Sequence, residues 1–177
     1  MLRTALRNNL SNEFLALFVY GTLKQGCENH EVYCKGALSV EPARVRGKLY
    51  QHPGGFPMLQ IPVSDIVAIG TADHLADMTA QTRHQTDSTD SNVQFDFEKD
   101  ENHWRLIQGE LMIFDDPGPR LSAIDELEEF YPGQTSLYRR VLIPVFTRNN
   151  SVVSAWVYAS EIDIENLRPI EADAWAC

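Results

Sequence analysis

The chain has 177 residues, 44% of them hydrophobic, which is enough for one domain with a substantial core. Twenty-five acidic against 15 basic residues give a formal charge of −10 at pH 7, which repels phosphate backbones and anionic lipid surfaces. Nucleic acid and membrane surfaces are therefore excluded as expected partners.

The start of the chain only partly resembles a secretory signal. Arg3 and Arg7 precede the apolar run 14–20, but the mostly polar stretch 8–13 separates them from it. No small-x-small cleavage site follows, and no other run reaches the roughly 18 apolar residues that a membrane span requires. We expect residues 1–13 to form a flexible leader.

Short apolar, β-branched or aromatic runs alternate with Gly/Pro turns and predict strands. In chain order these runs are 14–20, 43–51, 66–71, 106–114, 140–147 and 151–159. Helical signals occur at two stretches, a short one at 29–38 and a longer one at 120–131. The excess of strands predicts an α+β domain built on a curled, largely antiparallel sheet or small β-barrel with a few short helices.

Residues 79–103 differ in composition from the rest of the chain. The segment is rich in Thr, Asp, Ser, Gln and Asn, and carries six carboxylates against Arg83 and Lys99. We expect an acidic inserted surface loop that is solvated, with a binding surface as the alternative. We also expect residues 159–177 to form a C-terminal tail. The whole range 1–177 is expected to be a single domain.

Three cysteines, Cys27, Cys34 and Cys177, are an odd number and contain no C-x-x-C pair. The sequence therefore predicts no disulfide framework and a reducing, cytoplasmic location. A Cys27–Cys34 bridge is the alternative to two free thiols on or beside a short helix.

Metal and nucleophile motifs are absent from the sequence. The five histidines show neither H-E-x-x-H nor a C-x₂-C with paired His, and no serine lies in G-x-S-x-G. We expect no metal site. Trp104, Trp156 and Trp175 are expected to pack in the core or the tail, because an acidic chain is a poor platform for stacked bases.

The turn Gly-Thr-Leu-Lys-Gln-Gly at 21–26 follows a predicted buried strand and leads into a predicted helix. Backbone N–H groups in such a turn have no strand partner and attract a carboxylate or another anion. The spacing matches neither the P-loop nor the dinucleotide fingerprint. An ordinary tight turn would also explain the two glycines, so both interpretations stay open.

In the predicted helix 120–131, Glu128 is the carboxylate of "DELEE" that lies nearest the apolar stripe. A buried carboxylate must be paired, water-linked or functional, and burial would raise its pKa from about 4.3 toward neutrality, where it could accept and return a proton. The alternative is a half-exposed Glu128 paired with Arg139 or Arg140. At 100° per residue the stripe itself consists of Leu121, Ile124, Leu127 and Tyr131.

Several segments share an order and spacing that point to one family. They are "VYGTLKQG" with "NH" just behind it, "GKLY" at 47–50, "GFPML" at 55–59, "GELMIFDD" at 109–116, "IDELEEFYP" at 124–132 and "YRRVLIPV" at 138–145. Together they resemble the γ-glutamylcyclotransferase-like superfamily, in its γ-glutamylamine cyclotransferase and avirulence-induced-gene branch. The resemblance covers most of 18–158, and the closing "LRPIEADAW" is similar to the end of that branch.

The resemblance implies a mixed α/β cyclotransferase fold with a small barrel, and an enzyme whose reaction needs no metal or organic cofactor. It implies a small-molecule γ-glutamyl substrate and an acid–base role for Glu128. Tyr138 and Arg140 match the family's Y-x-R pair, which the resemblance places in the substrate site. The glutamyl-binding loop maps onto Tyr20, Gly21, Thr22 and Leu23.

The implied reaction is attack of the substrate's own α-amine on its γ-glutamyl amide carbonyl, which releases 5-oxoproline and an amine or amino acid. Two positions depart from the family: Glu129 stands where glycine is usual, and Phe130 where tyrosine is common. The alternatives are a non-catalytic module of the same fold that binds a γ-glutamyl metabolite or a protein, and an interaction domain that uses the acidic loop. No feature predicts an oligomeric state.

Overall fold

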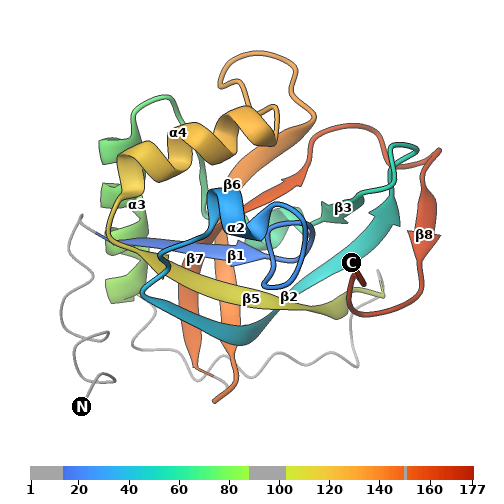
Figure 1. Cartoon of the computed structure of the whole chain (residues 1–177), viewed down its shortest axis with the longest axis horizontal. Coiled ribbons are helices and arrows are strands. Elements are labelled where there is room, and N and C mark those ends of the chain that lie inside the picture. The colour runs from blue at the N-terminus through green and yellow to red at the C-terminus, as the bar shows by residue number, and fades with distance from the viewer. Residues whose placement is uncertain (1–13, 88–102, 150) are drawn as a thin grey trace.

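A curled sheet dominates the computed structural model, which describes residues 14–87, 103–149 and 151–177 (Figure 1). The predicted leader 1–13 and most of the predicted acidic loop lie outside the described residues. In chain order the elements are β1 (Leu15–Val19), α2 (His30–Tyr33), β2 (Ser39–Gln51), β3 (Pro57–Gln60), the 3₁₀ helix η1 (Val63–Asp65), β4 (Ala68–Ile69), α3 (His74–Asp87), β5 (Arg105–Phe114), α4 (Pro117–Leu127), β6 (Tyr138–Thr147), β7 (Val152–Ser160) and β8 (Arg168–Ile170).

The sheet closes on itself because its path of paired strands returns to its starting strand. β2 pairs with β5, β5 with β1, β1 with β7, and β7 with β6. Ala43 and Arg44 of β2 then pair with Thr147 and Phe146 of β6, which completes a barrel. Of these pairings β1–β7 is parallel and the others are antiparallel. The predicted α+β class with a small, mostly antiparallel barrel is confirmed.

Strand β1 is buried on both faces, which explains why its sequence is an unbroken apolar run. One face, with Ala16 and Phe18, packs inside the barrel. The other face, with Leu15, Leu17 and Val19, packs in a second core beneath the helices. The strand that delivers the chain into the 21–26 turn is therefore held by packing on both sides.

Helix α3 corrects the prediction of a surface loop that begins at residue 79. The helix spans His74–Asp87 and lies beside α4 on the outer face of the sheet (Figure 1). Its buried face carries Met78 but also the polar Asp77 and Gln81. Backbone groups at the start of β1 and just before it satisfy Gln81, since its side chain accepts from the N–H of Ala16 and donates to the C=O of Phe14. Because polar residues occupy part of its inner face, the sequence of α3 lacks the apolar periodicity that predicts a helix.

Helix α4 begins and ends earlier than the predicted 120–131. It starts at Pro117, because proline is compatible with the first turn of a helix, and it ends at Leu127. Tyr131 therefore lies outside the helix and is exposed, contrary to its predicted place on the apolar stripe. Phe130 packs into the core in its place.

Two strands were not predicted, and one predicted strand is shorter than expected. β3 forms a hairpin with β2, and β8 pairs with the same strand within the segment expected to be a tail. The predicted strand 66–71 reduces to the two residues of β4, which pair with β6. Of the three tryptophans, Trp156 is fully buried, and Lys48 lies over the ring of Trp104.

The segment after β8 is fastened to the 21–26 turn, which corrects the cysteine prediction. Cys27 forms a disulfide with Cys177, whose Cα lies 5.6 Å away, while Cys34 is free and buried. Lys24 Nζ also donates to the C=O of Trp175 at 2.5 Å. The expectation of a reducing compartment loses its support, because it rested on the absence of a disulfide.

None of the helices in the described ranges is long and apolar enough to cross a membrane.

We predict that the Cys27–Cys177 disulfide stabilises the fold. The bond joins residues 150 positions apart, and such a long loop restricts the unfolded chain strongly. Cys177→Ser should lower the free energy of unfolding by about 2–4 kcal/mol, as measured by urea denaturation without reductant. Dithiothreitol should destabilise the wild type by the same amount and leave Cys177→Ser unchanged. Equal effects of dithiothreitol on both proteins would contradict the prediction.

Candidate active site

A cavity of about 210 Å³ opens where the turn after β1 meets the end of α4. Its volume suits a small metabolite, since sites for drug-sized ligands usually measure roughly 300–1,000 Å³. The cavity is lined by side chains and backbone from four regions: Phe18, Val19, Tyr20, Gly21, Thr22, Leu23, Glu28 and Asn29; Phe56 and Pro57; Leu127, Glu128, Glu129, Leu137 and Tyr138; and Tyr158.

The turn that forms one wall is braced from behind by Asn29 and His30, at the start of α2. Asn29 donates from its backbone N–H to the C=O of Thr22 at 3.1 Å and from Nδ2 to Thr22 Oγ1 at 2.9 Å. His30 Nδ1 lies 2.9 Å from the C=O of Leu23. The "NH" pair behind the turn therefore acts as its scaffold.

Three consecutive residues in this wall have backbone N–H groups with no partner in the described part of the chain. The N–H groups of Gly21, Thr22 and Leu23 donate no hydrogen bond to any residue in the described part of the chain, although all three residues line the cavity. Adjacent free amides favour an anion such as a carboxylate or an oxyanion. Gly21 also allows close packing, because a Cβ there would lie 2.9 Å from Pro57 Cγ.

The phenol groups of the cavity wall are held by backbone carbonyls. Tyr20 donates to the C=O of Tyr158 at 2.8 Å, and Tyr138 donates to the C=O of Pro57 at 2.7 Å. Burial, reinforced by the negative charge of Glu128, raises the pKa of each of these phenols well above its ordinary value. Both therefore stay protonated and fix the shape of the cavity.

Glu128 carries the least exposed carboxyl of the cavity, because Glu28 and Glu129, which also line it, are exposed. It remains partly accessible through the cavity mouth, but protein surrounds it on most sides. Burial raises the pKa of its carboxyl from 4.5 to about 7. Neither Arg139 nor Arg140 forms an ion pair with it among the described residues, so the predicted alternative of a paired Glu128 is not supported. A carboxyl with a pKa near neutrality can accept and return a proton.

The backbone after α4 fixes Glu128 at the helix terminus. The N–H of Phe130 donates to the C=O of Asp125 at 2.9 Å, and that of Glu129 donates to the C=O of Glu126 at 3.3 Å. This is the Schellman arrangement, and it requires a left-handed residue just beyond the cap. Glu129 adopts that conformation with φ 51°. Glycine would adopt this conformation without the steric cost of a Cβ.

The structure brings six of the seven predicted site residues to this cavity: Glu128, Tyr20, Gly21, Thr22, Leu23 and Tyr138. Arg140 is not among the lining residues. Its side chain is fully buried, and its guanidinium forms ion pairs with Asp77 and Asp125. Asp77 and Asp125 thus engage the Arg140 guanidinium outside the cavity lining, and a contact between Arg140 and a substrate stays a prediction.

Several lining residues were not predicted from the sequence, among them Glu28, Asn29 and Tyr158. For Tyr158 the reason is plain. Its strand was predicted, but no short motif marks it as part of a site. Phe56 and Pro57 lie in "GFPML", which contributed to the resemblance without being assigned a role. Within the described ranges, no group of three or more His, Cys, Asp or Glu side chains is placed to hold a metal ion.

Comparison with known families gives one match. The family described as "Gamma-glutamyl cyclotransferase, AIG2-like" matches residues 17–81 and 74–177. These ranges include the turn, the end of α4 and Tyr158. No curated protein matches the chain.

Two solved structures share the fold. YkqA from Bacillus subtilis superposes with a TM-score of 0.52 at 20% identity, over 92% of this chain and 39% of that one. The chain thus spans about two fifths of the length of YkqA. An AIG2-like protein (ggact) from Mus musculus superposes with a TM-score of 0.51 at 18% identity, over 93% of this chain and 89% of that one. At these identities the likeness shows the fold alone.

We predict that Glu129→Gly stabilises the protein. Glycine adopts a positive φ without the steric cost of a Cβ, so the free energy of unfolding should rise by about 0.5–1 kcal/mol in urea denaturation. Glu129→Ala is the matched control, because it removes the same charge but keeps the Cβ. A glycine variant no more stable than the alanine variant would show that the left-handed conformation carries no strain.

We also predict that Glu128 makes stability depend on pH. A carboxyl whose pKa is raised in the folded state binds more protons when folded than when unfolded between pH 4.5 and about 7, so its contribution to stability falls as pH rises through this window. Glu128→Gln should be more stable than the wild type at pH 8 by about 1–3 kcal/mol, and nearly equal to it at pH 4.5. Urea denaturation at both pH values measures the difference. A gap that is the same at both pH values would contradict the raised pKa.

Proposed function

Because the chain belongs to the gamma-glutamyl cyclotransferase, AIG2-like family, we propose that it catalyses cyclisation of a γ-glutamyl amide to 5-oxoproline with release of an amine or amino acid. One observation carries this proposal. A carboxyl whose pKa burial raises to about 7 lines the same small cavity as Gly21, Thr22 and Leu23, whose backbone N–H groups have no partner among the described residues. Acid–base catalysis and anion binding are the two tasks that this reaction requires.

In the proposed reaction the substrate supplies its own nucleophile. Its α-nitrogen attacks the carbonyl carbon of the side-chain amide, and the bond from that carbon to the leaving nitrogen breaks. The α-ammonium loses two protons on becoming the lactam N–H, and the leaving nitrogen gains two on departing as an ammonium. Atoms and charge therefore balance without a further reactant, and the protein's tasks are positioning and proton transfer.

The turn after β1 is suited to hold the charged end of the substrate. The N–H groups of Gly21, Thr22 and Leu23 would bind the α-carboxylate or the oxyanion that forms during attack. Tyr20 and Tyr138 would form the walls that curl the glutamyl chain, because their hydroxyl groups are already engaged with backbone carbonyls. Positioning of this kind lowers the entropy cost of reaching a reactive geometry.

Glu128 is suited to move the proton. As a carboxylate it would take a proton from the attacking nitrogen, and as an acid it would return one to the leaving nitrogen. A pKa of about 7 makes both forms available near neutral pH. The ionised form starts the reaction, so we expect kcat/KM to rise as pH increases toward and through about 7.

We predict that Glu128→Gln abolishes most of the activity and preserves the fold. Loss of general acid–base catalysis should lower kcat by about 10²–10⁴-fold. The assay incubates the pure protein with γ-glutamyl dipeptides, γ-glutamylamines and ε-(γ-glutamyl)lysine, and follows 5-oxoproline by mass spectrometry. Glu126→Gln is the matched control, because Glu126 is an exposed carboxylate of the same helix that does not line the cavity.

Two results would contradict the proposal in different ways. A Glu128→Gln variant with wild-type turnover would remove Glu128 from the acid–base role. No product from the wild type with any compound, together with thermal stabilisation by 5-oxoproline, would indicate a binding module instead of an enzyme.

A further inference from the structure

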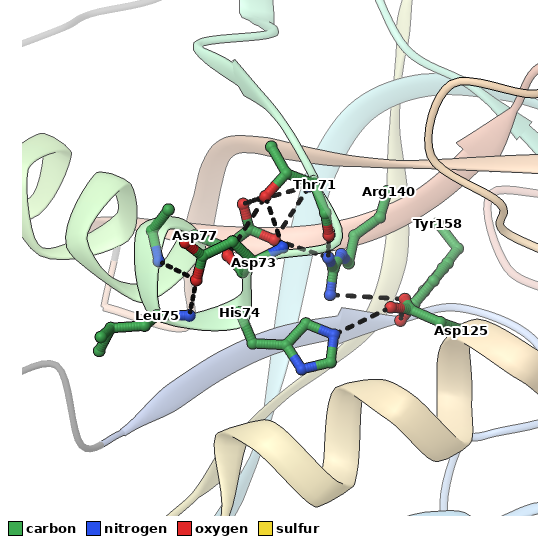
Figure 2. A network of polar contacts seen from close by, with 9 residues as sticks. Thr71, Asp73, His74, Leu75, Asp77, Asp125, Arg140 and Tyr158 are labelled. Carbon is green, nitrogen blue, oxygen red and sulfur yellow. Dashed lines mark hydrogen bonds and ion pairs between the residues drawn. The ribbon is translucent and has the colours of Figure 1, made fainter.

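A buried polar network lies behind the cavity and joins the helices α3 and α4 to the strands β6 and β7 (Figure 2). At its centre is Arg140, whose side chain is fully buried. Its Nη2 donates to Asp77 Oδ2 at 2.6 Å and to the C=O of Thr71 at 2.9 Å. Gly70 leaves room for the guanidinium, because a Cβ there would lie 2.6 Å from Arg140 Nε.

Asp125 is the member of this network that belongs to α4. Its Oδ1 accepts a hydrogen bond from the Tyr158 hydroxyl at 2.6 Å and lies 3.4 Å from Arg140 Nη1. Its Oδ2 lies 3.4 Å from His74 Nε2. One carboxylate therefore contacts groups from β6, β7 and α3, as Figure 2 shows.

The same residue anchors the turn that carries Glu128. The C=O of Asp125 accepts the N–H of Phe130, which closes the Schellman arrangement around Glu128. Helix ends fray readily, because their last carbonyls lack partners within the helix. Side-chain contacts to Asp125 hold this end of the helix in place, one turn before the carboxyl of the cavity.

Tyr158 connects this anchor to the cavity. It lines the cavity together with Glu128, its hydroxyl donates to Asp125, and its C=O accepts the hydroxyl of Tyr20. A shift of α4 relative to β7 would therefore change the place of Glu128 with respect to the wall formed by Tyr20 and Tyr158. The Phe130 ring packs edge-on against the Tyr158 ring, with centroids 6.4 Å apart.

Burying the charged groups of this network costs free energy, which argues for a role beyond stability. Burial raises the pKa of the Asp125 carboxyl despite the opposing effects of Arg140, Tyr158 and His74. Buried ion pairs often contribute less to stability than well-packed apolar residues of the same size, but they can specify one arrangement. Here that arrangement fixes the end of α4.

We propose that Asp125 is a positioning residue, an inference that rests on the proposed function. The contacts of Asp125 with Tyr158 and Arg140 would hold Glu128 in the cavity. Asp125 does not line the cavity and does not touch the substrate in this proposal. Its effect on the reaction is transmitted through the backbone of residues 125–130.

The test compares two variants of the anchor with a matched control. Asp125→Asn weakens the contact with Arg140, and Tyr158→Phe removes the hydrogen bond without changing any charge near neutral pH. The control is Asp65→Asn, because Asp65 forms a similarly buried ion pair with Arg46 at 2.6 Å and neither residue lines the cavity. All three variants should lose stability. A change in kcat or in the pKa of Glu128 that occurs only in the two anchor variants therefore reports on positioning.

The kinetic readout is the split between kcat and KM. Displacement of a catalytic group by about 1 Å can cost 10²-fold in rate, so we expect kcat to fall about 10- to 100-fold in both anchor variants, with KM within about twofold. Asp65→Asn should keep the wild-type kcat. An anchor variant with wild-type kcat, or an equal loss in Asp65→Asn, would overturn the proposal.

The second readout does not require turnover. The pKa of the Glu128 carboxyl can be followed by ¹³C NMR on glutamate-labelled protein, with the resonance assigned by its absence in Glu128→Gln. It should fall from about 7 toward 4.5 in both anchor variants, as the carboxyl becomes more hydrated, and stay near 7 in Asp65→Asn.

These outcomes separate the two proposals. If the wild type forms no 5-oxoproline, the proposed function fails, and the NMR titration still decides whether Asp125 positions Glu128. A fall of the Glu128 pKa in Asp125→Asn alone, with Tyr158→Phe unchanged, would be a charge effect and would overturn the positioning role. If Asp125→Asn does not fold, Tyr158→Phe against Asp65→Asn remains the test.

Discussion

The end of α4 is the constraint on which the site depends. Glu128 lies where the helix stops, in a turn closed by the backbone hydrogen bond from Phe130 to Asp125. The turn requires a left-handed residue, and Glu129 takes that conformation although it is not glycine. The site therefore accepts backbone strain next to its titratable carboxyl, a combination that is frequent at functional sites.

The opposite wall of the cavity, the turn after β1, is held by strand packing, hydrogen bonds and a disulfide. Strand β1 is buried on both faces and paired on both edges, so the chain enters the 21–26 turn from one of the most constrained parts of the molecule. Hydrogen bonds from Asn29 brace the turn, and a disulfide at Cys27 ties it to Cys177. Two rigid walls, one a loop with free amides and the other a helix end, thus face one small cavity.

The sequence allowed the barrel class and most of the site to be predicted, because the relevant signals are local. The unbroken apolar run of β1 identifies a strand buried on both faces, and the helical wheel selects Glu128 even though the helix ends just before it. Signals that depend on distant contacts were missed. Gln81 and Asp77 are buried by partners far along the chain, Arg140 forms its ion pair with Asp77 instead of lining the cavity, and Cys177 lies 150 residues from Cys27.

The proposed function requires a γ-glutamyl group to lie between the backbone amides of the turn and Glu128. A crystal structure of Glu128→Gln soaked with a γ-glutamylamine tests it most directly. We expect the substrate carboxylate within hydrogen-bond distance of the N–H groups of Gly21 to Leu23, and the scissile amide beside residue 128. A γ-glutamylamine bound elsewhere, or bound in this cavity with its carboxylate away from the turn, would contradict it.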